Sequence, residues 1–228
     1  PIAPTRAAAP DGVVSFDSRK NARVMKQLQR DSTARIYFAA SLSRVLPAYP
    51  MHAHYRIRFE ELTAATEALL AAVEALPHPS ARPADGGWSG TQVVRHLLTA
   101  ETGIVALLEK QVARPAAELP AAGLGEWLRG KLLSWQLGRA GKRFKAPTRL
   151  AEPAGEAVEV ERLRREWTTL RQRLGRVLAD FPASHTSRAV FQHPRAGWLT
   201  LPQTLRFFTD HVRHHQQQVG RLAAALRA

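Results

Sequence analysis

Four long stretches of this sequence place apolar residues three, four or seven positions apart, a spacing that gives a helix one apolar face. They cover residues 54–76, 90–112, 157–181 and 200–228, and a shorter stretch covers 123–138. Strand-like alternation is not sustained anywhere, so we expect no sheet. Because each helix must bury its apolar face against another element, the sequence predicts an all-α protein, a four-helix bundle with a short extra helix.

Two of these helices have clearly marked starts. Ser89 is followed three residues later by Gln92, and Thr200 is followed three residues later by Gln203. In this capping-box pattern the Ser or Thr hydroxyl accepts a hydrogen bond from the third helical N–H. The Gln side chain in turn accepts one from the backbone N–H of the Ser or Thr. The pattern predicts that helices begin directly after Ser89 and Thr200.

The first 50 residues differ from the rest of the chain. Residues 1–10 are rich in Ala and Pro, and no helical stripe is sustained before residue 51. We therefore predict a mostly irregular N-terminal extension over residues 1–50, mobile or weakly ordered, and a helical domain over residues 51–228. A targeting peptide is the alternative for this Arg-rich, acid-poor segment.

Composition excludes several kinds of site. The chain has no Cys, which rules out disulfides, thiolate metal sites and a Cys nucleophile, so a transition-metal site must use His, Asp or Glu. No apolar run approaches the roughly 18 residues of a membrane span. We expect a soluble, cytoplasmic protein.

The sharpest charge run of the sequence supplies half of the net charge of +14. No acidic residue occurs between Trp127 and Ala151, whereas seven residues there are basic: Arg129, Lys131, Arg139, Lys142, Arg143, Lys145 and Arg149. One interpretation is a solvated loop. The other is a basic rim, with Lys142, Arg143 and Lys145 as its candidates, that steers an acidic substrate toward a nearby pocket.

Two His residues lie on the apolar face of the stretch over 200–228. His215 fills the gap between Val212 and Val219, and His211 lies one helical turn earlier. Two inward imidazoles one turn apart can share a metal ion. The ordinary alternative is a pair of core histidines that are hydrogen-bonded to their neighbours.

Three segments together resemble the DinB-like superfamily, which includes the YfiT-type proteins. They are Trp88-Ser-Gly-Thr-Gln-Val-Val-Arg-His96-Leu-Leu, His193-Pro-Arg-Ala-Gly-Trp-Leu-Thr and His211-Val-Arg-His-His215-Gln-Gln-Gln-Val. The resemblance covers roughly residues 53–227. It implies a four-helix bundle and a divalent metal held by three His, which match His96, His211 and His215 here. His214, at the edge of the same helix face, is expected to support the site without binding the metal.

The resemblance also implies a function. Three His ligands leave a coordination position open, as in reactive rather than structural sites. Several relatives act with low-molecular-weight thiols, so we expect a metal-dependent enzyme, a thiol-dependent S-transferase or a hydrolase, with zinc or nickel as the metal and a thiol as co-substrate. Glu101, in the apolar stripe five residues after His96, is a candidate base or hydrogen-bond acceptor. Alternatively, its side chain lies at the edge of this stripe and reaches solvent.

A non-enzymatic interpretation stays open at this point. The bundle can be a helical binding or stress-related protein whose basic face contacts nucleic acid or other anions. Under the enzymatic interpretation we expect an anionic small-molecule substrate, allow for a homodimer, and expect neither nucleic acid nor a membrane as a partner.

Overall fold

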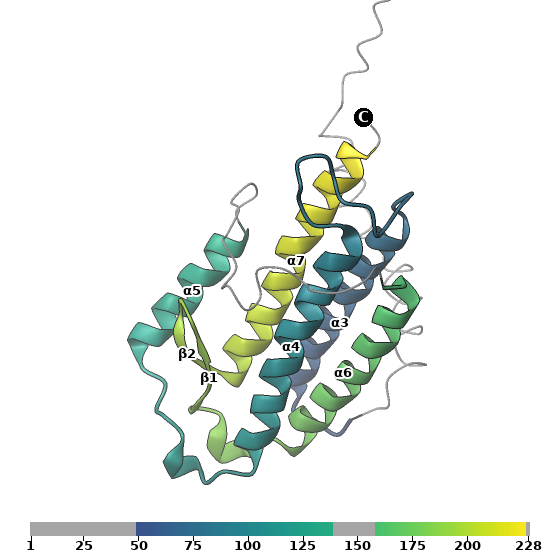
Figure 1. The fold of residues 1–228 in the computed structure, drawn as a ribbon. Coiled ribbons are helices and arrows are strands. Elements are labelled where there is room, and N and C mark those ends of the chain that lie inside the picture. The colour runs from purple at the N-terminus through teal and green to yellow at the C-terminus, as the bar shows by residue number, and fades with distance from the viewer. Residues whose placement is uncertain (1–48, 139–157, 227–228) are drawn as a thin grey trace, which may run out of the picture. The chain divides into compact units, whose positions relative to one another are not determined.

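The computed structural model describes residues 49–138 and 158–226 (Figure 1). The predicted extension over residues 1–50 lies almost entirely outside these ranges. The basic residues Lys142, Arg143 and Lys145 lie outside them as well.

Four long helices form the body of the described domain. They are α3 (Ala53–Glu74), α4 (Gly90–Val112), α6 (Val160–Asp180) and α7 (Leu201–Ala225). Helix α3 packs along α7, and α4 packs against both α6 and α7 (Figure 1). Every helix end lies within three residues of the predicted one, so the predicted all-α bundle is confirmed.

The shorter helix α5 (Leu124–Gly138) lies beside the bundle, against α7 (Figure 1). Two short 3-10 helices, Ala116–Glu118 and Ala183–His185, occur in the connections. The capping boxes also form as predicted. Gln92 Oε1 accepts from the Ser89 backbone N–H at 2.9 Å, and Gln203 Oε1 accepts from that of Thr200 at 2.8 Å.

A β-hairpin precedes α7, and the expectation of no sheet was wrong for this segment. Strand β1 (Ala189–His193) pairs antiparallel with β2 (Gly197–Thr200), with an irregular register between Ala189 and Phe191. Five- and four-residue strands with an irregularity show too little alternation to be recognised from the sequence. The turn depends on Gly197, whose φ of 73° suits glycine.

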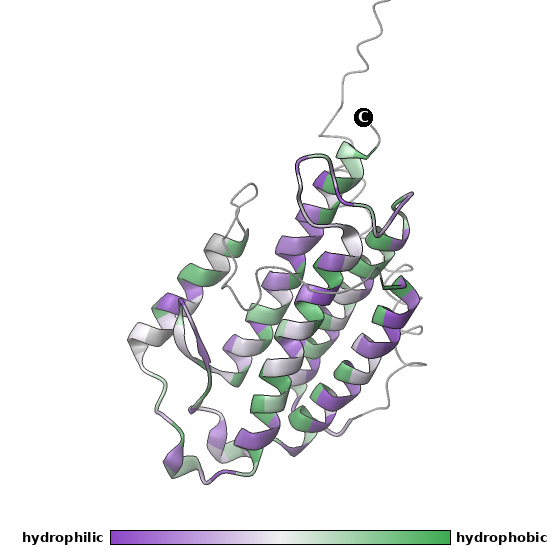
Figure 2. Ribbon diagram, viewed as in Figure 1, coloured by the Kyte–Doolittle hydropathy of each residue, from purple (hydrophilic) through white to green (hydrophobic). Residues whose placement is uncertain are grey.

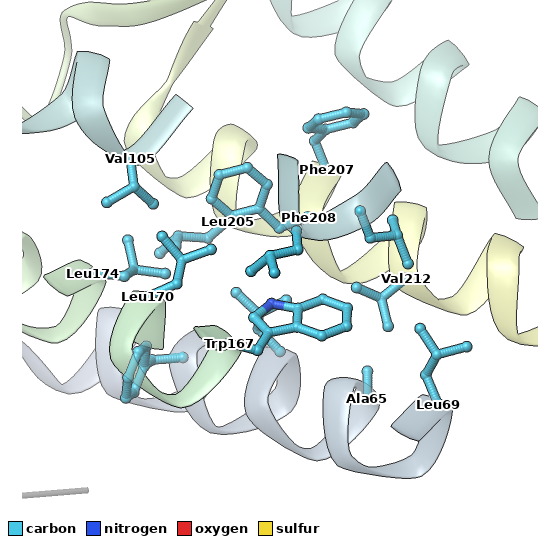
Figure 3. Packing of buried hydrophobic residues seen from close by; sticks show 14 of the residues in the cluster. Ala65, Leu69, Val105, Trp167, Leu170, Leu174, Leu205, Phe207, Phe208 and Val212 are labelled. Atoms are coloured by element: carbon cyan, nitrogen blue, oxygen red, sulfur yellow. The ribbon is translucent and has the colours of Figure 1, made fainter. Parts of the chain in front are cut away.

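The core lies between the four long helices. Trp167 of α6 is 1% exposed and packs among aliphatic and aromatic residues of α3, α6 and α7 (Figure 3). Burying one large apolar side chain contributes about 1.5–3 kcal/mol, so this shared core is the main stabilising term. Figure 2 shows that hydrophobic and hydrophilic residues lie on different sides of α6, with the hydrophilic ones on its outer side. None of the helices in the described residues is long and apolar enough to cross a bilayer.

The start of α4 lies very close to the end of α3. Gly90 allows this approach, because a Cβ there would lie 2.8 Å from Leu76 Cδ1 and 3.2 Å from the Pro79 carbonyl oxygen. The Thr91 N–H donates to the same Pro79 carbonyl at 3.1 Å, which holds the connection against α4.

Replacing Gly90 with Ala should therefore destabilise the fold by about 1–3 kcal/mol, the usual cost of overpacking. Urea unfolding followed by circular dichroism measures the change. Gly103→Ala in the same helix is the matched control, because a Cβ there meets no atom within 4 Å. Ala is the better helix former, so this control should gain up to about 1 kcal/mol. Equal effects of the two substitutions would show that α3 and α4 do not approach each other in this way.

Candidate metal centre

Three histidines from two packed helices come together in the bundle. His96 lies about two turns into α4, and His211 and His215 lie one turn apart on α7. Each offers a ring nitrogen, and these nitrogens all lie within 4.8 Å of one another. Their ring centroids are separated by 4.9 to 5.5 Å. The structure thus brings together the three residues that the sequence singled out.

The spacing of the two α7 histidines fits a shared ion. Their Nε2 atoms are 3.2 Å apart. Two nitrogens bound at about 2.0–2.1 Å to one tetrahedral ion would be about 3.3 Å apart. His211 and His215 therefore already have the separation that two ligands of one ion require, and an ion bound there would replace the hydrogen bond between their rings.

Gln218 orients the His215 ring. Its Oε1 lies 2.8 Å from His215 Nδ1, and because an amide oxygen only accepts, Nδ1 carries the proton. The Nε2 lone pair of His215 then points toward His211. In this tautomer Nε2 of His215 is free of a proton and can bind a metal. Gln218 is not among the site residues predicted from the sequence; its spacing of three from His215 is the signal that indicates it.

The electrostatics of the cluster favour neutral imidazoles. His96 and His215 are buried and His211 is half-buried. Burial lowers the pKa of His215 to about 3, and the neighbouring His96 contributes to the shift. Burial, together with His215 and His96, also holds the pKa of His211 well below its usual value of 6.5. Neutral imidazole is the form that binds a metal, so near pH 7 neither ring has to lose a cationic proton before it binds one.

Two aromatic rings flank the cluster. The Trp88 ring lies 4.9 Å from that of His96 and is nearly parallel to that of His215, at 6.3 Å and 9°. Phe207 lies nearly parallel to His211, with centroids 5.3 Å apart. These rings restrict the orientation of the imidazoles and limit their contact with water. Neither was predicted to be part of the site.

The order of these elements matches a known family. The family model described as the DinB superfamily matches residues 58–219, a range that contains all three histidines. The chain belongs to the DinB superfamily. The resemblance carried by the three sequence motifs is thereby confirmed. No curated protein and no solved structure matches the chain.

In this DinB-superfamily protein His193, from the second of those motifs, holds the turn of the β1–β2 hairpin. Its Nδ1 accepts from the backbone N–H groups of Arg195 and Ala196, both at 3.1 Å. Burial, with a contribution from Arg195, lowers the pKa of His193 to about 4. A proton on Nδ1 would also displace both hydrogen bonds. His193 therefore stays neutral near pH 7 and stabilises the turn.

His214 links two helices of the DinB domain. Its Nδ1 lies 3.1 Å from the carbonyl oxygen of Leu137, to which it donates, so it attaches the last turn of α5 to α7. Burial lowers its pKa. Its ring also lies 5.4 Å from that of His215. The observed contacts give His214 a docking role, and the supporting role at the metal site stays a prediction.

Glu101 lies on a different side of α4 from the histidines. Five residues turn the helix by about 140°, so Glu101 does not share a face with His96. Its Oε2 accepts from Arg171 Nη1 at 2.6 Å and from Trp167 Nε1 at 3.2 Å. Arg171 in turn donates to Thr66 at 2.7 Å, joining α3, α4 and α6.

This network changes the interpretation of Glu101. The side chain is 1% exposed, so the alternative of a Glu that reaches solvent is excluded. Its contacts favour a structural role within the core. The role as a base stays a prediction without a contact that supports it.

Replacing His96, His211 or His215 with Ala should lower zinc affinity by at least about 100-fold, because a three-ligand site has no spare ligand. Competition with a chromogenic chelator measures the affinity of tag-free protein. Each variant should keep its helical circular dichroism, because the apolar core does not depend on an ion. Unchanged affinity in His211→Ala would contradict the site.

The same titration separates ligands from supporting residues. His214→Ala should weaken binding far less than the three ligand substitutions. Gln218→Ala should weaken binding by about 10- to 100-fold, since it orients a ligand. Gln217→Ala, one residue away and exposed, is its matched control and should leave affinity unchanged.

Glu101→Ala should destabilise the protein by about 3–5 kcal/mol, because it leaves the buried Arg171 charge without a partner. Urea unfolding measures the loss. Glu109→Ala is the matched control, since Glu109 pairs with Arg173 at 2.7 Å where both side chains are about one third exposed, and it should cost less than about 1 kcal/mol. A stable Glu101→Ala protein that lacks catalytic activity would instead support the role as a base.

Proposed function

We propose that this DinB-superfamily protein is a divalent-metal-dependent enzyme whose ion is held by His96, His211 and His215. The observation that carries the proposal is the convergence of their ring nitrogens within 4.8 Å of one another. The lowered pKa of two of these rings and the tautomer set by Gln218 support it further.

The number of ligands favours a reactive site over a structural one. Structural zinc sites are closed by four protein ligands, whereas catalytic sites keep a position open. Among the described residues the group consists of these three histidines alone. The apolar core of the bundle extends well beyond them, so its stability does not require an ion.

The proposed chemistry is thiol-dependent S-transfer, with hydrolysis as the alternative. When bound, the ion supplies a Lewis acid that lowers the pKa of a coordinated thiol or water. In S-transfer a thiol sulfur forms a bond to an electrophilic carbon, the leaving group departs with its electron pair, and the thiol proton goes to solvent. The family resemblance supports the thiol, and zinc or nickel suits an imidazole donor set.

The residues around the ligands have separate tasks in this proposal. Gln218 holds His215 in its metal-binding tautomer. Trp88 and Phe207 pack against the imidazoles, which keeps them fixed and limits water around the site. A site of this kind gains from fixed ligands, because a preorganised site needs no rearrangement during the reaction.

Tag-free protein loaded with zinc or nickel should form thioethers from a panel of low-molecular-weight thiols and a chromogenic aryl halide. The absorbance of the product measures turnover. Chelation should abolish turnover and metal should restore it, and His211→Ala should be inactive. Gln217→Ala is the control and should keep full activity.

A parallel assay with a chromogenic ester tests the hydrolase alternative. Ester cleavage that depends on metal and on His211, without thioether formation, would select hydrolysis. Metal-loaded protein that turns over neither the thiol panel nor the ester would contradict the proposed enzymatic function while leaving the metal site intact.

A further inference from the structure

Helix α5 leaves large apolar side chains in solvent. The described residues include four exposed large hydrophobic side chains, and three of them are on α5: Trp127 (50%), Leu128 (60%) and Leu132 (50%). The opposite side of the same helix buries Leu133 and Leu137. A helix that is apolar on two sides usually has a second partner, because clustered exposed apolar groups mark interaction sites.

The exposed side of α5 also carries a positive charge. Lys131 is exposed between these apolar residues, and its Nζ lies 5.4 Å from the centroid of the Trp127 ring. Between Trp127 and Gly138, where α5 ends, the sequence contains no acidic residue, and the chain as a whole carries a net charge of +14. A partner of this face must therefore combine an apolar region with negative charge.

We propose that the exposed face of α5, formed by Trp127, Leu128, Lys131 and Leu132, docks on the surface of an anionic lipid bilayer. Leu and Trp side chains of an amphipathic helix enter the boundary between headgroups and acyl chains, and a Lys reaches the lipid phosphates from the same depth. Anionic headgroups attract the Lys131 ammonium and a chain whose net charge is +14.

Other partners fit these side chains less well. A nucleic acid offers phosphates and bases but no apolar region for Leu128 and Leu132. A second copy of the chain would bring another Lys131 and another net charge of +14 against this face, and like charges repel. The lipid surface matches both properties of the face.

This inference departs from the expectation that the protein has no membrane partner. That expectation rests on the absence of a long apolar run, which concerns only helices that cross a bilayer. Docking on a surface needs only one uncovered amphipathic face. The inference is independent of the metal site and of the proposed reaction.

Co-sedimentation of the full chain with lipid vesicles tests the proposal. The protein should bind vesicles that contain phosphatidylserine, bind phosphatidylcholine vesicles at least about 10-fold more weakly, and lose affinity as salt is raised. The double variant Leu128→Ser/Leu132→Ser should bind the anionic vesicles at least about 10-fold more weakly than the wild type. The emission of Trp127, identified by comparison with Trp127→Tyr, should shift to the blue on binding.

Ile57→Ser is the matched control, because Ile57 on α3 is 59% exposed but lies outside this face. It should bind anionic vesicles like the wild type, and circular dichroism should show that all variants are folded. Undiminished binding by the double variant, or an equal loss in Ile57→Ser, would overturn the proposal. So would a chain that ignores vesicles and instead dimerises, or binds RNA, through Leu128 and Leu132.

Discussion

Burial of the apolar face of α7 is the constraint on which the rest of the structure depends. Leu205, Phe208, Val212 and Val219 are fully buried in that face, and α3 and α4 pack against it. His215 interrupts the face, so an imidazole is buried wherever the bundle forms. A buried polar ring requires a partner, and here Gln218 and His211 provide it. The packing that stabilises the fold therefore also assembles the site.

Helix α4 carries buried polar groups on two sides, and they have different physical roles. On one side, His96 faces the α7 histidines, with which it forms a group that could hold a metal ion. On the other, Glu101 and Arg171 neutralise each other, each no more than 3% exposed. Such a pair adds little net stability but is costly to break, so it favours one arrangement of α3, α4 and α6. Keeping the carboxylate away from the histidines preserves a ligand set made of imidazoles alone.

Helix α5 adds Leu133 and Leu137 to the edge of the core, and further contacts hold it in place. Gly130 permits a close approach to Gln203 and Leu199, and His214 binds the carbonyl of Leu137. One side of α5 is thereby fixed against α7 and the hairpin, while Trp127, Leu128 and Leu132 stay in solvent. Docking of α5 thus joins α7, which carries two of the three candidate metal ligands, to the face that we assign to lipid.

The sequence by itself determined the helices, their capped starts and the shared face of His211 and His215, because these features depend on spacing within one helix. His96 was assigned to the same site from family resemblance, and tertiary packing brought it within reach. Only tertiary structure decided the partner of Glu101, the contacts of Trp88 and Phe207 with the imidazoles, and the exposed side of α5. These features join residues far apart in the chain, and helical periodicity carries no information about which faces meet.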